Sequence, residues 1–87
     1  MMDNNTVIQD FVDKYKELFE KNVAIQRNRK TKLGIIEYSF VCDTLSTKDK
    51  LMDIIKNIEK LFILSDSEVL SSVVFSLTTI VDIVTVS

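Results

Sequence analysis

The chain has 87 residues, enough for one small domain, and its 46% hydrophobic content excludes a compositionally disordered protein. It contains no histidine and a single cysteine, Cys42, which excludes Ser-His-Asp triads, histidine metal sites and an internal disulfide framework. The net charge of −2 provides no general attraction to nucleic acid or to an anionic membrane.

The first predicted element is a long helix over residues 6–31. Thr6 begins a capping-box pattern, in which the hydroxyl accepts a hydrogen bond from a backbone N–H of the first turn. The apolar side chains that follow recur at spacings of three and four and share one helical face: Ile8, Phe11, Val12, Tyr15, Leu18 and Phe19. The basic run 27–32 followed by Gly34 is typical of a helix end, because cations complement the C-terminal dipole.

Residues 33–45 fit two patterns. One is the alternation of a strand, with Glu37 and Ser39 between the apolar residues Ile36, Tyr38, Phe40 and Cys42. The other is a helical face shared by Leu33, Ile36 and Phe40. A strand needs a partner, and the candidates are residues 22–28 and the C-terminal segment, each of which would have to give up its predicted helix. We therefore expect a short helix here and keep a strand near 35–42 as the alternative.

The third predicted element is an amphipathic helix over residues 47–63. Ser46 is a suitable N-cap, and charged or amide side chains occupy the polar face. The apolar stripe is unbroken: Leu51, Ile54, Ile55, Ile58, Leu61 and Phe62.

The last segment, 66–85, is rich in valine, isoleucine and threonine, a composition that favours a strand. The run Ser65-Asp66-Ser67-Glu68 is nevertheless a complete capping box. Apolar residues then follow at helical spacing: Leu70, Val73, Val74, Leu77, Ile80, Val81 and Val84. A strand of this length would be unusually long, so the pattern predicts a helix.

These elements together predict an all-α fold, a small bundle of three or four helices, with residues 1–87 forming a single helical domain. The alternative is an α+β fold with a strand near 35–42. Residues 69–86 approach the length of a membrane span, but serines, threonines and Asp82 dilute them, so we expect no span.

Catalytic equipment is missing from the sequence. A single glycine cannot build a phosphate-binding loop, and the carboxylates lie on predicted solvated helix faces. Cys42 lies among apolar residues with Asp43 beside it, which suits a structural role. We therefore expect no enzymatic activity, no catalytic residues, no metal and no cofactor.

The basic segment is the one charged feature that suggests a ligand. Its cations could bind phosphates: Arg27, Arg29, Lys30 and Lys32. No aromatic side chain in the run could stack on bases, and complementing a helix dipole explains the charges more simply. Nucleic-acid binding through 27–32 is therefore the alternative function, and a nucleic-acid partner is not expected.

The preferred function is a non-enzymatic protein–protein interaction module, such as a small adaptor, inhibitor, immunity protein or chaperone-type subunit, that acts through apolar helix surfaces. Phe75, Ile83 and Val86 lie outside the main C-terminal stripe and are the predicted partner-binding residues. A homo-oligomer or hetero-complex would bury them. The acidic, polar residues 1–5 do not resemble a secretory signal, and the lone thiol favours a reducing compartment, so we expect a cytoplasmic protein.

Overall fold

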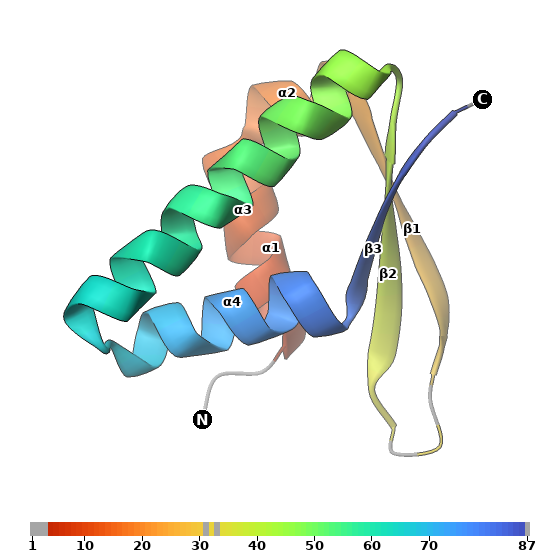
Figure 1. Cartoon of the computed structure of the whole chain (residues 1–87). Helices are drawn as coiled ribbons and strands as arrows, with labels where there is room; N and C mark the ends of the chain where they lie inside the picture. The colour runs from red at the N-terminus through yellow and green to blue at the C-terminus, as the bar shows by residue number, and fades with distance from the viewer. Residues whose placement is uncertain (1–3, 31, 33, 87) are drawn as a thin grey trace.

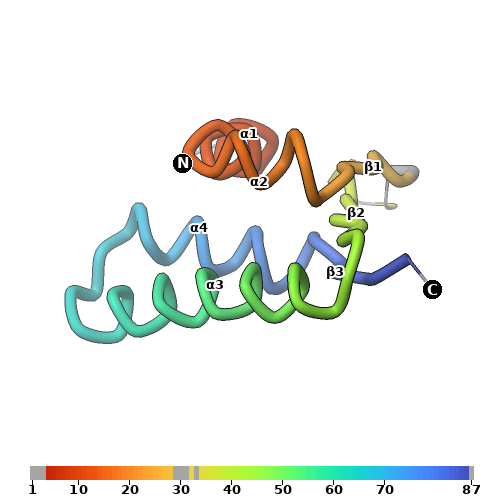
Figure 2. The backbone as a smooth tube through the Cα atoms, turned by 90° about the horizontal axis from the view of Figure 1, so that it is seen from above, coloured from red at the N-terminus to blue at the C-terminus, as the bar shows by residue number. Residues whose placement is uncertain are grey.

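A computed structural model describes residues 4–30, 32 and 34–86 and has an α+β fold (Figure 1). The elements in chain order are α1 (Asn4–Lys14), α2 (Lys16–Lys21), β1 (Val23–Lys30), β2 (Ile36–Cys42), α3 (Leu45–Ser65), α4 (Glu68–Thr79) and β3 (Val81–Thr85). The strands form one mixed sheet in the order β1-β2-β3. All four helices lie on one side of this sheet, and its other face is open (Figure 2).

The register of the sheet decides which side chains face the helices. β1 and β2 are antiparallel, with Ile25 opposite Phe40, and β2 and β3 are parallel, with Phe40 opposite Ile83. Because successive side chains of a strand point to opposite faces, this row lies on the face covered by the helices. The neighbouring row, in which Val41 pairs with Ala24 and Val84, lies on the open face.

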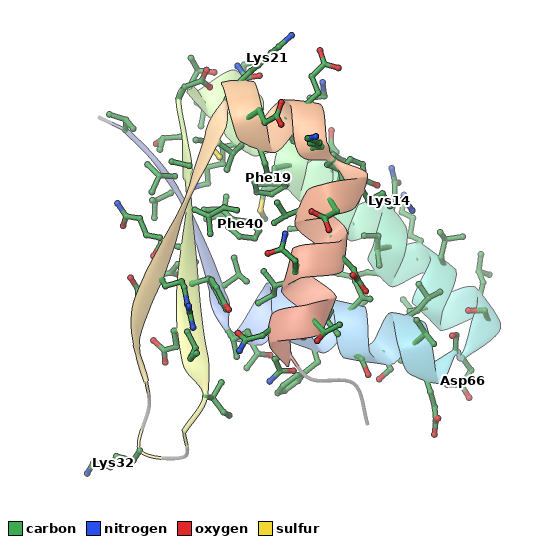
Figure 3. All side chains as sticks on the ribbon, turned by 180° about the vertical axis from the view of Figure 1, so that it is seen from behind. Lys14, Phe19, Lys21, Lys32, Phe40 and Asp66 are labelled. Carbon is green, nitrogen blue, oxygen red and sulfur yellow. The ribbon has the colours of Figure 1, made fainter. Side chains whose placement is uncertain are left out.

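The core between the two layers is centred on an aromatic cluster. Phe40 is fully buried, and its ring centroid lies 4.9 Å from that of Phe19 and 6.4 Å from that of Phe11 (Figure 3). Leu51 of α3 and Leu77 of α4 complete the packing with 0% and 2% of their surface exposed. The apolar stripes of the first and third predicted helices therefore do face the core.

The prediction of an all-α helical bundle is wrong, and its first error concerns the N-terminal helix. The helical part of 6–31 ends at Lys21, and Asn22 caps α2 through its N–H to the Leu18 C=O at 2.9 Å. The apolar stripe already stops after Phe19. From Val23 onward the backbone pairs with β2 instead, which satisfies the same polar groups that a longer helix would have satisfied internally.

The second error concerns residues 33–45. The alternative of a strand near 35–42 matches β2, whose odd-even burial follows the alternation of apolar and polar residues. The helical pattern was misleading because neither possible partner is helical. The residues around 22–28 form β1 and those near the C-terminus form β3, so both are available to pair with β2. β2 is therefore the central strand, with a neighbour on each side.

The third error concerns the C-terminal segment. Helix 66–85 is present only as far as Thr79, and the residues after Ile80 form β3. Valine and isoleucine occupy positions that fit a helical stripe and an alternating strand equally well. Their β-branched side chains favour a strand, and β2 provides an edge with which that strand can pair. The N-cap is Ser67, whose Oγ accepts from the Leu70 N–H at 3.4 Å, because α3 continues through Ser65.

The predicted helix 47–63 is confirmed as α3, which begins earlier and ends later than expected. Thr44, not Ser46, is the N-cap, since its Oγ1 accepts from the Thr47 N–H at 3.1 Å. α3 ends at Ser65, its C-cap is Asp66 in the left-handed conformation at φ 51°, and a helical hairpin with α4 follows.

Among the described residues no helix is both long enough and apolar enough to cross a membrane.

Candidate strand-pairing groove

β3 is an edge strand with a row of free backbone groups. Tyr38 of β2 donates its N–H to the Ile80 C=O at 2.9 Å, which sets the phase of the parallel ladder. In this phase every second residue of β3 bonds to β2, and the residues between turn their N–H and C=O groups outward. These outward residues are Val81, Ile83 and Thr85, and no other hydrogen bond of the described residues uses their backbone groups.

The opposite edge of the sheet is built differently. The β1 register shifts between Arg27 and Lys30, and β1 carries cations where β3 carries Asp82 as its single charge. Bulges and basic side chains are the usual means by which natural sheets prevent edge pairing. The groove beside this edge, between α1 and β1, has a volume of about 440 Å³ and is lined by both an acid, Asp10, and a base, Arg27. The β3 edge lacks these protective features and is the better candidate for pairing.

A groove runs along the β3 edge, and we call it the α3–β3 groove. It has a volume of about 360 Å³ and is lined by residues of α3, α4 and β3. The described apolar residues that line it are Met52 and Ile55 of α3, Leu77 of α4, and Val81 and Ile83 of β3. Met52 is 38% exposed, so the groove offers accessible apolar surface next to the free backbone groups of β3.

Charged side chains border this apolar floor. Lys48 and Lys56 lie on the α3 side, one on each side of Met52 in sequence, and Glu59 follows them. The two salt bridges among the described residues, Lys16–Glu20 and Lys21–Glu17, both lie within α2, so neither groove lysine takes part in one. The α3 wall of the groove therefore carries two lysines without a salt bridge among the described residues and one glutamate, a net charge of +1.

The predicted partner-binding residues do not form one surface. Ile83 is half-buried and lines the α3–β3 groove, as a member of β3. Val86 directly follows β3 and is 63% exposed, but the strand alternation places it with Val84 on the open face of the sheet. Phe75 is 49% exposed on α4 and does not line the groove.

The basic segment 27–32 lies in the β1–β2 hairpin and not at a helix end, so its interpretation as a dipole complement is wrong. Arg27 is exposed on β1, and Lys32 points outward at the end of the hairpin (Figure 3). The side chains of Arg29 and Lys30 lie outside the described residues. The structure therefore places two of the four predicted phosphate-binding side chains, and they lie apart: Arg27 borders the groove between α1 and β1, and Lys32 lies at the end of the hairpin (Figure 3).

The groove residues on α3 were missed by sequence reasoning. Lys48, Met52 and Lys56 recur every four residues and so form one stripe on the helix. An exposed methionine between two lysines on an otherwise polar face was the available signal. Nothing in the local sequence shows, however, that this stripe lies beside Val81 and Ile83.

Titratable groups in the described residues form no constellation that suggests catalysis. Cys42 is buried, and this burial raises the pKa of its thiol; Asp43 raises it further, while Lys48 lowers it. A thiol with a raised pKa is a poor nucleophile. No group of three or more His, Cys, Asp or Glu side chains in the described part of the chain could hold a metal ion.

Comparisons with known proteins give no match: no family model, no curated protein and no solved structure is significantly similar to this chain.

Proposed function

We propose that this protein is a non-enzymatic protein-binding module that adds an extended segment of a partner protein to the free edge of β3. The observation that supports this most directly is the outward row of backbone groups on Val81, Ile83 and Thr85 beside an open apolar groove. In strand addition, backbone hydrogen bonds supply affinity and pockets for alternate side chains supply specificity. The β3 edge and the α3–β3 groove offer both.

Nucleic-acid binding remains the second candidate, and the position of the β1–β2 hairpin is the observation in its favour. Arg27 and Lys32 are exposed, and Lys32 lies at the end of the hairpin, away from the helices (Figure 3). Against it, the net charge is −2 and no aromatic side chain lies within 27–32. An Arg27→Gln, Lys32→Gln variant separates the two candidates, because it should keep peptide binding and would lose phosphate contacts.

The test uses a displayed library of random peptides selected on the immobilised protein. Selected peptides should bind the wild type and Thr85→Val equally, and should bind Thr85→Pro at least about tenfold more weakly, because proline removes an outward N–H and obstructs the edge. The Thr85 N–H is not used by β2, so the fold should survive. Circular dichroism of both variants checks this.

Hydrogen exchange provides a second measurement that does not depend on the proline variant. A bound peptide should slow exchange of the Val81 and Ile83 N–H groups in the wild type. Failure to select any peptide, or selected peptides that bind Thr85→Pro as tightly as the wild type and leave these amides unprotected, would reject strand addition at β3.

A further inference from the structure

We infer that the segment bound at β3 is an extended acidic peptide with the pattern acidic-x-apolar-x-acidic, in which x is any residue. The inference rests on the proposed strand addition and specifies its partner. It follows from the charge of the α3 wall, from the spacing of Lys48 and Lys56, and from the apolar side chain between them.

The spacing of the two lysines matches that of a strand. Lys48 and Lys56 are separated by about 12 Å along the α3 axis, at about 1.5 Å per residue. Side chains at i and i+4 of an extended peptide point to the same face and lie about 13 Å apart, at about 3.3 Å per residue. Two acidic residues at that spacing can therefore each reach one lysine when the peptide lies along the groove.

The residue between the two acids faces an apolar floor. Met52 lies midway between Lys48 and Lys56, and Leu77 and Val81 lie across the groove from it. The i+2 side chain of the peptide points to the same face as the two acids, so an apolar residue there would cover Met52. The pattern reads the same in both directions and thus fits a parallel or an antiparallel added strand.

A second copy of the chain fits this edge less well. Pairing of two β3 strands about a two-fold axis would place both α3 helices on the same face of the joined sheet, next to each other. Lys48 and Lys56 of one copy would then lie near the same lysines of the other, and like charges in contact oppose association. An acidic peptide neutralises these lysines, which is why we prefer it.

Three labelled peptides test the pattern by fluorescence anisotropy at low salt. The probe is acetyl-TTETLTETT-amide, the charge control is acetyl-TTKTLTKTT-amide, and the register control is acetyl-TTTELETTT-amide, whose acids lie on the strand face opposite the leucine. The probe should bind about tenfold more tightly than the lysine peptide. It should also bind more tightly than the register control, which has the same charge.

A charge exchange then assigns the contact to the groove. The Lys48→Glu, Lys56→Glu variant should weaken binding of the probe about tenfold and should prefer the lysine peptide. Lys50→Glu, Lys60→Glu is the matched control, because it makes the same change in net charge on the same helix at two lysines that do not line the groove. Lys50 borders a different hollow, between α2 and α3, so this variant should bind the probe nearly as the wild type does.

The outcomes separate failure of the inference from failure of the proposed function. If all three peptides bind equally and protect the Ile83 N–H from exchange, strand addition stands and the acidic pattern is rejected. If none binds and the free protein is a dimer that Thr85→Pro makes monomeric, the occupant is a second copy and the inference is overturned. If none binds and the protein is a monomer, both proposals fail.

Discussion

Phe40 lies in the middle of the covered face of the sheet, between Ile25 of β1 and Ile83 of β3, and none of its surface is exposed. Its ring packs edge-on against Phe19 of α2, with an angle of 75° between the ring planes. This one side chain therefore connects the three strands to the N-terminal helices.

Replacing Phe40 by alanine should lower the free energy of unfolding by about 3–5 kcal/mol, because it removes a buried ring and leaves a cavity. Phe75→Ala is the matched control, since the same ring is removed where 49% of it is exposed. Phe75→Ala should lower the free energy of unfolding by less than about 1 kcal/mol. Urea unfolding followed by circular dichroism measures both; equal losses would show that Phe75 is as buried as Phe40 in solution.

Asp43 joins three elements at one corner of the molecule. Its carboxylate accepts hydrogen bonds from the Thr47 hydroxyl at 2.5 Å and from the Asn22 side-chain amide at 2.8 Å. These bonds, that of Thr47 first, lower the pKa of the Asp43 carboxyl from its ordinary value. The ionised form is thus favoured by folding, so its contribution is present above the ordinary carboxyl pKa and disappears as the pH falls through the lowered one.

Asp43→Asn should therefore destabilise the protein near neutral pH, and the difference from the wild type should shrink as the pH is lowered toward about 2. Thermal unfolding across this pH range measures the difference. Asp53→Asn removes the same charge from the exposed side of α3 and should give a smaller difference near neutral pH. If the difference in stability between the wild type and Asp43→Asn stays constant down to acid pH, the role assigned to the Asp43 carboxylate is wrong.

Among the elements, β3 is the one whose identity differs most from its local pattern. A helix continued through Thr85 would use every backbone N–H internally, whereas a strand paired on one side uses every second one. The two structures therefore predict different patterns of amide exchange over the same residues.

In the free protein, the Asp82 and Val84 amides should exchange slowly, because the register directs them to β2, and the Ile83 and Thr85 amides should exchange quickly. Amide exchange measured by NMR tests this residue by residue. Uniform slow exchange across 81–85 would indicate a helix, or a strand already paired on both sides.

The burial of α3 follows its apolar stripe along only part of the helix. Its stripe predicts burial from Leu51 to Phe62, and Leu51 and Ile55 are indeed buried. Leu61 is 55% exposed, because α3 extends beyond the sheet and the N-terminal helices toward the hairpin with α4 (Figure 1). Helical periodicity identifies the face of a helix, but the length of the layer opposite it decides how much of that face is covered.

At the scale of the whole molecule, the four helices cover one face of the sheet and leave one face and two edges free (Figure 2). The edges differ in protection, since β1 has an irregular register and basic residues and β3 has neither. The β3 edge also adjoins the lysine-bordered α3–β3 groove. The binding function proposed here depends on this asymmetry, which exists only after the strands are assembled.

The helices whose signals are local could be predicted from the amino-acid sequence. α3 follows from an unbroken apolar stripe, α1 and α2 contain the predicted N-terminal stripe, and the N-cap of α4 lies two residues after the predicted one, at Ser67 instead of Ser65. The predicted cap of the first helix is wrong, because Thr6 lies inside α1. The sequence also shows the absence of histidine and the surplus of β-branched residues near the C-terminus. These features depend on contacts between residues three or four apart, which any short window contains.

The strands and the candidate site depend on contacts that form only when the chain is folded. β2 and β3 pair residues far apart in the chain, as Phe40 with Ile83, whereas β1 pairs with β2 across a hairpin. The segments of β2 and β3 each also fit a helical pattern when taken alone. Likewise, the stripe of Lys48, Met52 and Lys56 becomes a groove wall only because β3 lies beside it. The physical reason is that the hydrogen bonds of a strand are made with a distant segment, so its stability cannot be read from its own residues.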